Sequence, residues 1–148
     1  MIEVRTFLRN PDGTFGQLSE SSAPPKDPWY VEGAIELVVD GVEVCGQAQW
    51  DLVDQLWAYI CTMLEEFRTQ DRVSTNFPDM PVELVFERLP AGRVLVTCAG
   101  SEVRRAATGE GEFVRALSSA ARSALEQLSA LLPSNSAGYE DALRRLGK

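Results

Sequence analysis

The stretch Ile35–Cys45, IELVVDGVEVC, decides the fold that the sequence predicts. Two short runs rich in valine, isoleucine and leucine flank Asp40-Gly41, a dipeptide preferred in two-residue β-hairpin turns. β-branched side chains on both sides of the turn favour strands. After Cys45 the apolar positions follow a helical spacing over about residues 49–69. The sequence therefore predicts a hairpin followed by a helix.

The same order of elements recurs later in the chain. Residues 82–98 predict a second hairpin, and residues 112–132 predict a second long helix that ends at a proline. Two ββα-type units, at about 29–69 and 82–132, most simply form one antiparallel sheet with two long helices on one face. The recurrence also has a simpler explanation, because a hairpin followed by a helix is a common order.

The flanking segments complete the expected architecture. Residues 2–9 alternate apolar and polar side chains, as in a half-buried strand. Residues 19–28 contain three prolines and three serines, a composition that predicts a loop. Apolar residues after Pro133 predict a short C-terminal helix. We therefore expect residues 1–148 to form a single α+β domain, a two-layer sandwich with an antiparallel sheet of about five to seven strands.

Composition argues against several classes of function. The 148 residues include 22 acidic and 14 basic side chains, and a formal charge of −8 argues against binding to a nucleic-acid backbone. Histidine is absent, which excludes Ser-His-Asp and Cys-His nucleophile systems and histidine-ligated metals. The sequence also lacks nucleotide-binding loops and a visible nucleophile–base pair. We expect a protein that is not an enzyme, with no cofactor and no metal.

Cysteine usage and hydropathy indicate the compartment. Cys45, Cys61 and Cys98 are an odd number without Cys-x-x-Cys spacing, and each lies among apolar residues, so buried free thiols are expected. No signal-peptide pattern is visible, and no apolar run approaches the roughly 20 residues of a membrane-spanning helix. We therefore expect a cytoplasmic protein without a membrane partner.

The negative charge is concentrated in the first part of the chain. Residues 1–66 contain 12 acidic and 3 basic side chains, whereas residues 67–148 contain 10 acidic and 11 basic side chains. A surface of one sign steers association with a partner of the opposite sign. The same charge also suits a solvated surface that keeps the protein soluble.

The apolar arc of the first predicted helix is unusually wide. At 100° per residue it covers roughly 200°, about twice what a helix on a single sheet needs. One explanation is a central helix that is covered on two sides. The other is an apolar interface with a partner or a second copy of the chain, formed by Leu52, Leu56, Tyr59 and Met63.

Acidic and aromatic residues supply a second candidate surface. Carboxylates occupy the narrow polar strip of the same helix, and two aromatic residues precede the first predicted hairpin. Such aromatic residues are typical anchors of protein interfaces, although core packing is the commoner role. The candidate partner-binding residues are Asp51, Asp54, Glu65, Glu66, Trp29 and Tyr30.

Two segments, Trp50–Tyr59 (WDLVDQLWAY) and Tyr139–Leu146 (YEDALRRL), carry a resemblance to a known group. With the acidic composition, they make the chain resemble the small immunity proteins of bacterial polymorphic-toxin and contact-inhibition systems. The segments cover under a fifth of the chain, so no functional residue transfers. The resemblance implies a protein-binding module that neutralises a basic toxin domain through an acidic helix face. The alternatives are a small-ligand-binding or accessory domain with a pocket between sheet and first helix, and a structural homodimer.

Overall fold

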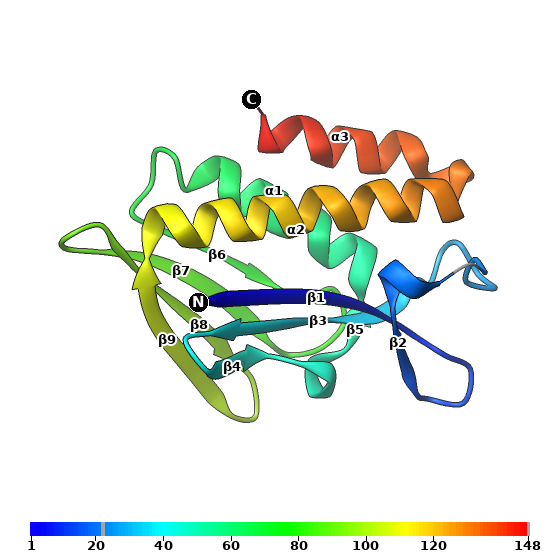
Figure 1. The fold of residues 1–148 in the computed structure, drawn as a ribbon, viewed down its shortest axis with the longest axis horizontal. Helices are drawn as coiled ribbons and strands as arrows, with labels where there is room; N and C mark the ends of the chain where they lie inside the picture. The colour runs from blue at the N-terminus through cyan, green and yellow to red at the C-terminus, as the bar shows by residue number, and fades with distance from the viewer. Residues whose placement is uncertain (22, 148) are drawn as a thin grey trace.

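The computed structural model describes residues 1–21 and 23–147, so residue 22 of the predicted 19–28 loop lies outside the described residues. Within these ranges the chain folds into two antiparallel sheets and three α-helices (Figure 1). The strands of the first sheet are β1 (Ile2–Arg9), β2 (Phe15–Gln17), β3 (Glu32–Val39), β4 (Val42–Cys45) and β5 (Asp51–Leu52). The strands of the second are β6 (Arg72–Asn76), β7 (Glu83–Leu89), β8 (Arg93–Ala99) and β9 (Val103–Gly109). The helices are α1 (Val53–Glu66), α2 (Glu110–Leu131) and α3 (Ser136–Leu146).

The first sheet is built around β3. Its strand order is β2-β1-β3-β4, and the short β5 also pairs with β3. The predicted hairpin is confirmed: β3 and β4 pair through Val39 and Val42, and both turn residues have positive φ, 49° at Asp40 and 85° at Gly41. Such angles at both positions are typical of the turn that Asp-Gly favours.

The second sheet is a meander in the order β6-β7-β8-β9. Its edge strand β9 lies against β4 of the first sheet, and Arg104 of β9 donates a hydrogen bond to the carbonyl oxygen of Glu43 at 3.3 Å. The expectation of α+β architecture with antiparallel strands is confirmed. A single sheet of about five to seven strands is wrong, because the strands after α1 pair only among themselves and form a second sheet.

The helices pack on the strands and on one another. α1 contacts β3 and β6, α2 contacts β1, β8 and β9, and α3 packs against both α1 and α2. Figure 1 shows α3 on the side of α2 that faces away from the strands. Both long helices are present, but α1 begins four residues later than expected because Asp51-Leu52 pairs with β3 as β5.

The wide apolar arc of α1 is explained by this packing. Trp57 is fully buried and donates its indole N–H to the Thr6 hydroxyl oxygen at 3.0 Å. Three of the four residues of the predicted apolar interface are buried as well, with Leu52, Leu56 and Met63 exposed by 8, 3 and 1%, whereas Tyr59 is 38% exposed. The arc therefore faces the interior, and α1 is the central helix of the first explanation.

Candidate functional site

Asp51 does not lie on an exposed acidic strip, contrary to the prediction. It belongs to β5 and is only 3% exposed. Its carboxylate accepts hydrogen bonds from the backbone N–H groups of Leu52, Asp79 and Met80 at 2.7–3.1 Å. A buried carboxylate requires such partners. Asp51 thus fixes the loop before β7 to the start of α1 and is turned away from any docking partner.

Asp54 is also buried, and it supports a loop on the surface. It lies in the first turn of α1, is 9% exposed and accepts a hydrogen bond from the Tyr139 hydroxyl at 2.8 Å. The side-chain amide of Asn135 donates to that hydroxyl oxygen at 3.2 Å and to the carbonyl oxygen of Pro28 at 2.8 Å. Burial raises the pKa of Asp54, and the bond from Tyr139 partly opposes that rise. The hydrogen-bond chain ends at the residue directly before Trp29.

The other two predicted carboxylates lie at the opposite end of the helix. Glu65 is half-buried and accepts a hydrogen bond from Arg145 of α3 at 3.1 Å, whereas Glu66 is exposed. At 1.5 Å per residue, the 14 residues of α1 separate the two pairs by about 20 Å. The four carboxylates therefore do not form one acidic surface.

Trp29 and Tyr30 are strongly exposed, as interface anchors would be. Their exposed fractions are 78 and 62%. A turn presents them: the Asp27 carboxylate accepts the Trp29 backbone N–H at 2.9 Å, and the Asp27 carbonyl oxygen accepts the Tyr30 N–H at 3.1 Å. Pro28 occupies the second position of this turn, where its fixed φ is favourable. We refer to Trp29 and Tyr30 as the aromatic pair.

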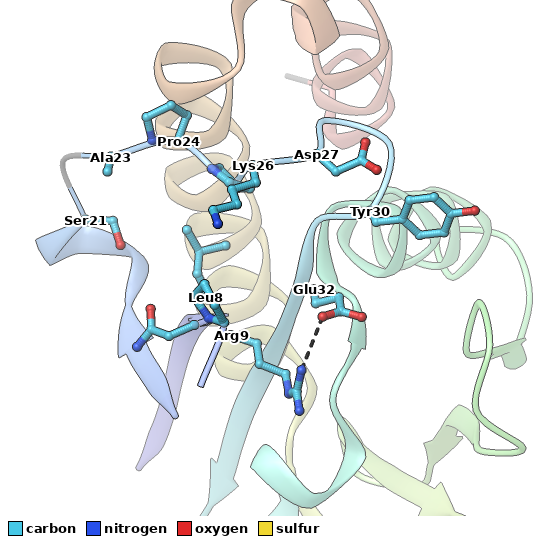
Figure 2. A pocket seen from close by; sticks show the side chains of 12 residues that line it. Leu8, Arg9, Ser21, Ala23, Pro24, Lys26, Asp27, Tyr30 and Glu32 are labelled. Atoms are coloured by element: carbon cyan, nitrogen blue, oxygen red, sulfur yellow. Dashed lines mark hydrogen bonds and ion pairs between the residues drawn. The ribbon is translucent and has the colours of Figure 1, made fainter. Parts of the chain in front are cut away.

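A pocket of about 650 Å³ adjoins the aromatic pair (Figure 2). Three segments line it: the end of β1 with the following turn, the proline-rich loop, and the first part of the chain leading into β3. Arg9 pairs with Glu32 at 3.4 Å on one wall, and its guanidinium group stacks on the Trp50 ring at 4.3 Å. Figure 2 shows Lys26 directed toward Leu8 across the pocket and the Tyr30 ring projecting outward.

The residues that position the aromatic pair are distant from it in the sequence, although Trp29 and Tyr30 themselves are named by the sequence as candidate anchors. Asn135 and Tyr139 hold the turn before the aromatic pair through Pro28 and Asp54. The bond between Tyr139 and Asp54 spans 85 positions of the sequence, and the bond between Asn135 and Pro28 spans 107. Contacts over such separations leave no local pattern in the sequence. The Arg9–Glu32 pair likewise joins two strands whose register is set only by the folded sheet.

The space between α1 and the first sheet is closed. The cavity there, lined by Ile35, Leu56 and Ile60 among others, has a volume of about 10 Å³. A cavity needs at least that much to hold one water molecule. This position has no room for the small ligand of the alternative hypothesis.

The cysteines are buried and free, as predicted. Burial raises the pKa of Cys61 to about 12. A hydrogen bond with Cys98, together with burial, raises the pKa of Cys45 well above its ordinary value. Both thiols are therefore protonated at neutral pH, a state that is poorly nucleophilic.

Over the described ranges, residues 1–21 and 23–147, no group of three or more acidic, cysteine or histidine side chains is placed to hold a metal ion. Within the same part of the chain, none of the helices has the length and apolar character needed to cross a bilayer. Comparisons with protein-family models, with curated proteins and with solved structures found no match.

Proposed function

We propose that this chain is a protein-binding module whose partner docks on the aromatic pair and inserts a side chain into the adjoining pocket. The observation that carries the proposal is the 78% exposure of Trp29 in a turn that Asn135, the residue directly before α3, anchors through Pro28. Adjacent exposed tryptophan and tyrosine side chains are costly in water and are enriched at the energetic centres of protein interfaces. Anchoring the turn lowers the entropy that is lost on binding.

The charge distribution supports a basic partner. With Asp51 and Asp54 buried, the excess of negative charge in the first part of the chain comes from residues 1–50, which contain eight acidic and three basic side chains. The pocket itself is lined by two acidic and two basic residues, Asp27, Glu32, Arg9 and Lys26, and the other carboxylates lie elsewhere on the first sheet and its loops. Complementary charge accelerates encounter and selects the partner. An immunity-like role, neutralising a basic toxin domain, is the specific form of this proposal.

Site-specific photo-crosslinking tests the docking surface. A photoreactive amino acid in place of Trp29 is expected to capture a protein in cells of the source organism, whereas the same group in place of Val103, which is 55% exposed on β9, does not capture it. The captured protein is then purified and titrated against the variants. Trp29→Ala is expected to weaken binding about 30-fold, as for an interface anchor, while Val103→Ala binds normally.

Two outcomes would contradict the proposal. The first is capture of the same protein from position 103, and the second is unchanged affinity of the Trp29→Ala variant.

The immunity-like role has a separate test, in which the captured partner is expressed alone or together with this chain. Relief of growth inhibition by the wild-type chain but not by Trp29→Ala supports that role. If the captured partner does not inhibit growth, the immunity-like role is wrong, whereas the proposal of a protein-binding module is unaffected.

A further inference from the structure

We infer that a pocket lined by arginines, at the other end of α1 from the aromatic pair, binds a dianionic phosphate group attached to an apolar body. The pocket has a volume of about 580 Å³. That volume lies within the range of small-molecule sites. The charged lining consists of Arg68, Arg88, Arg115, Arg122 and Glu110.

Two of these arginines are structural. Arg88 binds Glu110 at 2.9 and 3.2 Å, Asp71 at 3.0 Å and the carbonyl oxygen of Phe67 at 2.7 Å, and its guanidinium group stacks on the Phe67 ring. Arg68 donates to the carbonyl oxygen of Leu146 at 2.6 Å and so caps the end of α3. These bonds neutralise Glu110 and hold two of the walls in place.

The other two arginines are available to a ligand. Arg115 and Arg122 are exposed and form no ion pair with any residue in the described ranges. They share one face of α2 with Ser118, because positions separated by three, four and seven residues lie on one side of a helix. The lining therefore presents two uncommitted guanidinium groups and a hydroxyl group to the same space.

The excess of charge identifies the ligand class. Four arginines face one carboxylate in this pocket, although the whole chain carries a formal charge of −8. Guanidinium groups match phosphate oxygens in geometry as well as in charge. A net positive lining with several donors favours a dianion over a single carboxylate. The apolar part of the lining, Leu64, Phe67, Val114 and Leu146, suits an organic body attached to the phosphate.

Titration calorimetry at low ionic strength tests this inference with three probes: phenyl phosphate, inorganic phosphate and benzoate. We expect phenyl phosphate to bind with one-to-one stoichiometry and more tightly than inorganic phosphate, because its ring contacts the apolar lining. Arg115→Ala and Arg122→Ala are each expected to weaken phenyl phosphate binding about tenfold. Arg105→Ala, which removes an exposed arginine from β9 outside the pocket, serves as the matched control.

Each contrary outcome overturns a stated part of the inference. If benzoate binds as tightly as phenyl phosphate, the pocket does not prefer a dianion, and the assignment of a phosphate group is wrong. Equal loss of affinity in Arg105→Ala shows general attraction to positive charge rather than a site. Absence of phenyl phosphate binding, with thermal unfolding and circular dichroism showing a folded chain, removes the pocket as a phosphate site. Because Trp29 lies at the other end of α1, Trp29→Ala is expected to leave phenyl phosphate binding unchanged, which separates this test from that of the proposed function.

Discussion

At the scale of single residues, the point at which α1 begins decides what the carboxylates of Asp51 and Asp54 contact. A helical wheel that begins at residue 49 places Asp51 and Asp54 on one polar strip. In the structure α1 begins at Val53, so Asp51 lies in a strand and accepts three backbone N–H groups. Asp54 is in the first turn, where Tyr139 reaches it from α3. The charges could be read from the sequence, but their partners could not, because those partners arrive from distant segments.

The buried Asp54 makes stability depend on pH in a defined direction. Burial raises its pKa above the ordinary value of 3.8, so the folded state holds this proton more tightly than the unfolded state does. Between the two pKa values the folded state binds more protons, and this contribution to stability is lost as the pH rises through the folded pKa. Asn cannot titrate. We therefore expect the stability of Asp54→Asn, relative to wild type, to improve as the pH rises from about 4 through the raised pKa of Asp54.

Urea unfolding followed by tryptophan fluorescence at several pH values measures this difference. Tyr139→Phe is the companion variant: it removes the hydrogen bond that lowers the Asp54 pKa, so its decline in stability is expected to extend to higher pH than that of wild type. A difference between Asp54→Asn and wild type that does not change with pH would contradict the assignment.

At the scale of elements, two glycines are predicted to respond in opposite ways to the same substitution. A Cβ atom at Gly33 of β3 would lie 2.1 Å from the carbonyl oxygen of Phe7 and 2.8 Å from Cγ1 of Val53. Relief would require β1 or α1 to move, so Gly33→Ala is expected to lower the free energy of unfolding by about 3 kcal/mol. A Cβ atom at Gly138 of α3 meets nothing within 4 Å, and Gly138→Ala is expected to raise it by about 0.5–1 kcal/mol.

Equilibrium urea denaturation of the two variants and wild type measures both effects. Each substitution adds one methyl group to a glycine, so the two variants serve as controls for each other. An unchanged or higher midpoint for Gly33→Ala would show that the close approach of β3 to β1 and α1 does not govern stability, and a lower midpoint for Gly138→Ala would contradict the prediction for α3.

Elements with local signals could be predicted, and those defined by distant pairing could not. The Asp40-Gly41 hairpin and both long helices follow from turn chemistry and periodicity within a few residues. The strand β6 could not be predicted because its sequence, RVSTN, contains a single apolar residue, Val73, and therefore shows no alternation. The division into two sheets depends on which strands pair, and a hairpin pattern alone does not specify its neighbours. Two adjacent aromatic residues before a predicted hairpin could be named from the sequence as candidate anchors, but their exposure could not, and the pocket walls come together only on folding.

At the scale of the whole molecule, the packing of α1 predicts the state of association. A homodimer through the wide apolar arc would need Leu52, Leu56 and Met63 on the surface, but all three are buried between the sheets and the other helices. The formal charge of −8 adds repulsion between copies. The free chain is therefore expected to be a monomer of 16.3 kDa at all concentrations accessible to sedimentation equilibrium.

Salt provides the control for this expectation, because it screens the repulsion but leaves the packing of α1 unchanged. If charge alone kept the copies apart, high salt would produce a species of about twice the monomer mass, and the apolar contact would have to come from another surface. Trp29→Ala would then identify that surface: a dimer that dissociates in this variant uses the aromatic pair, whereas one that persists uses a different face. A mass that stays at the monomer value in low and high salt leaves the aromatic pair free for the partner that we propose.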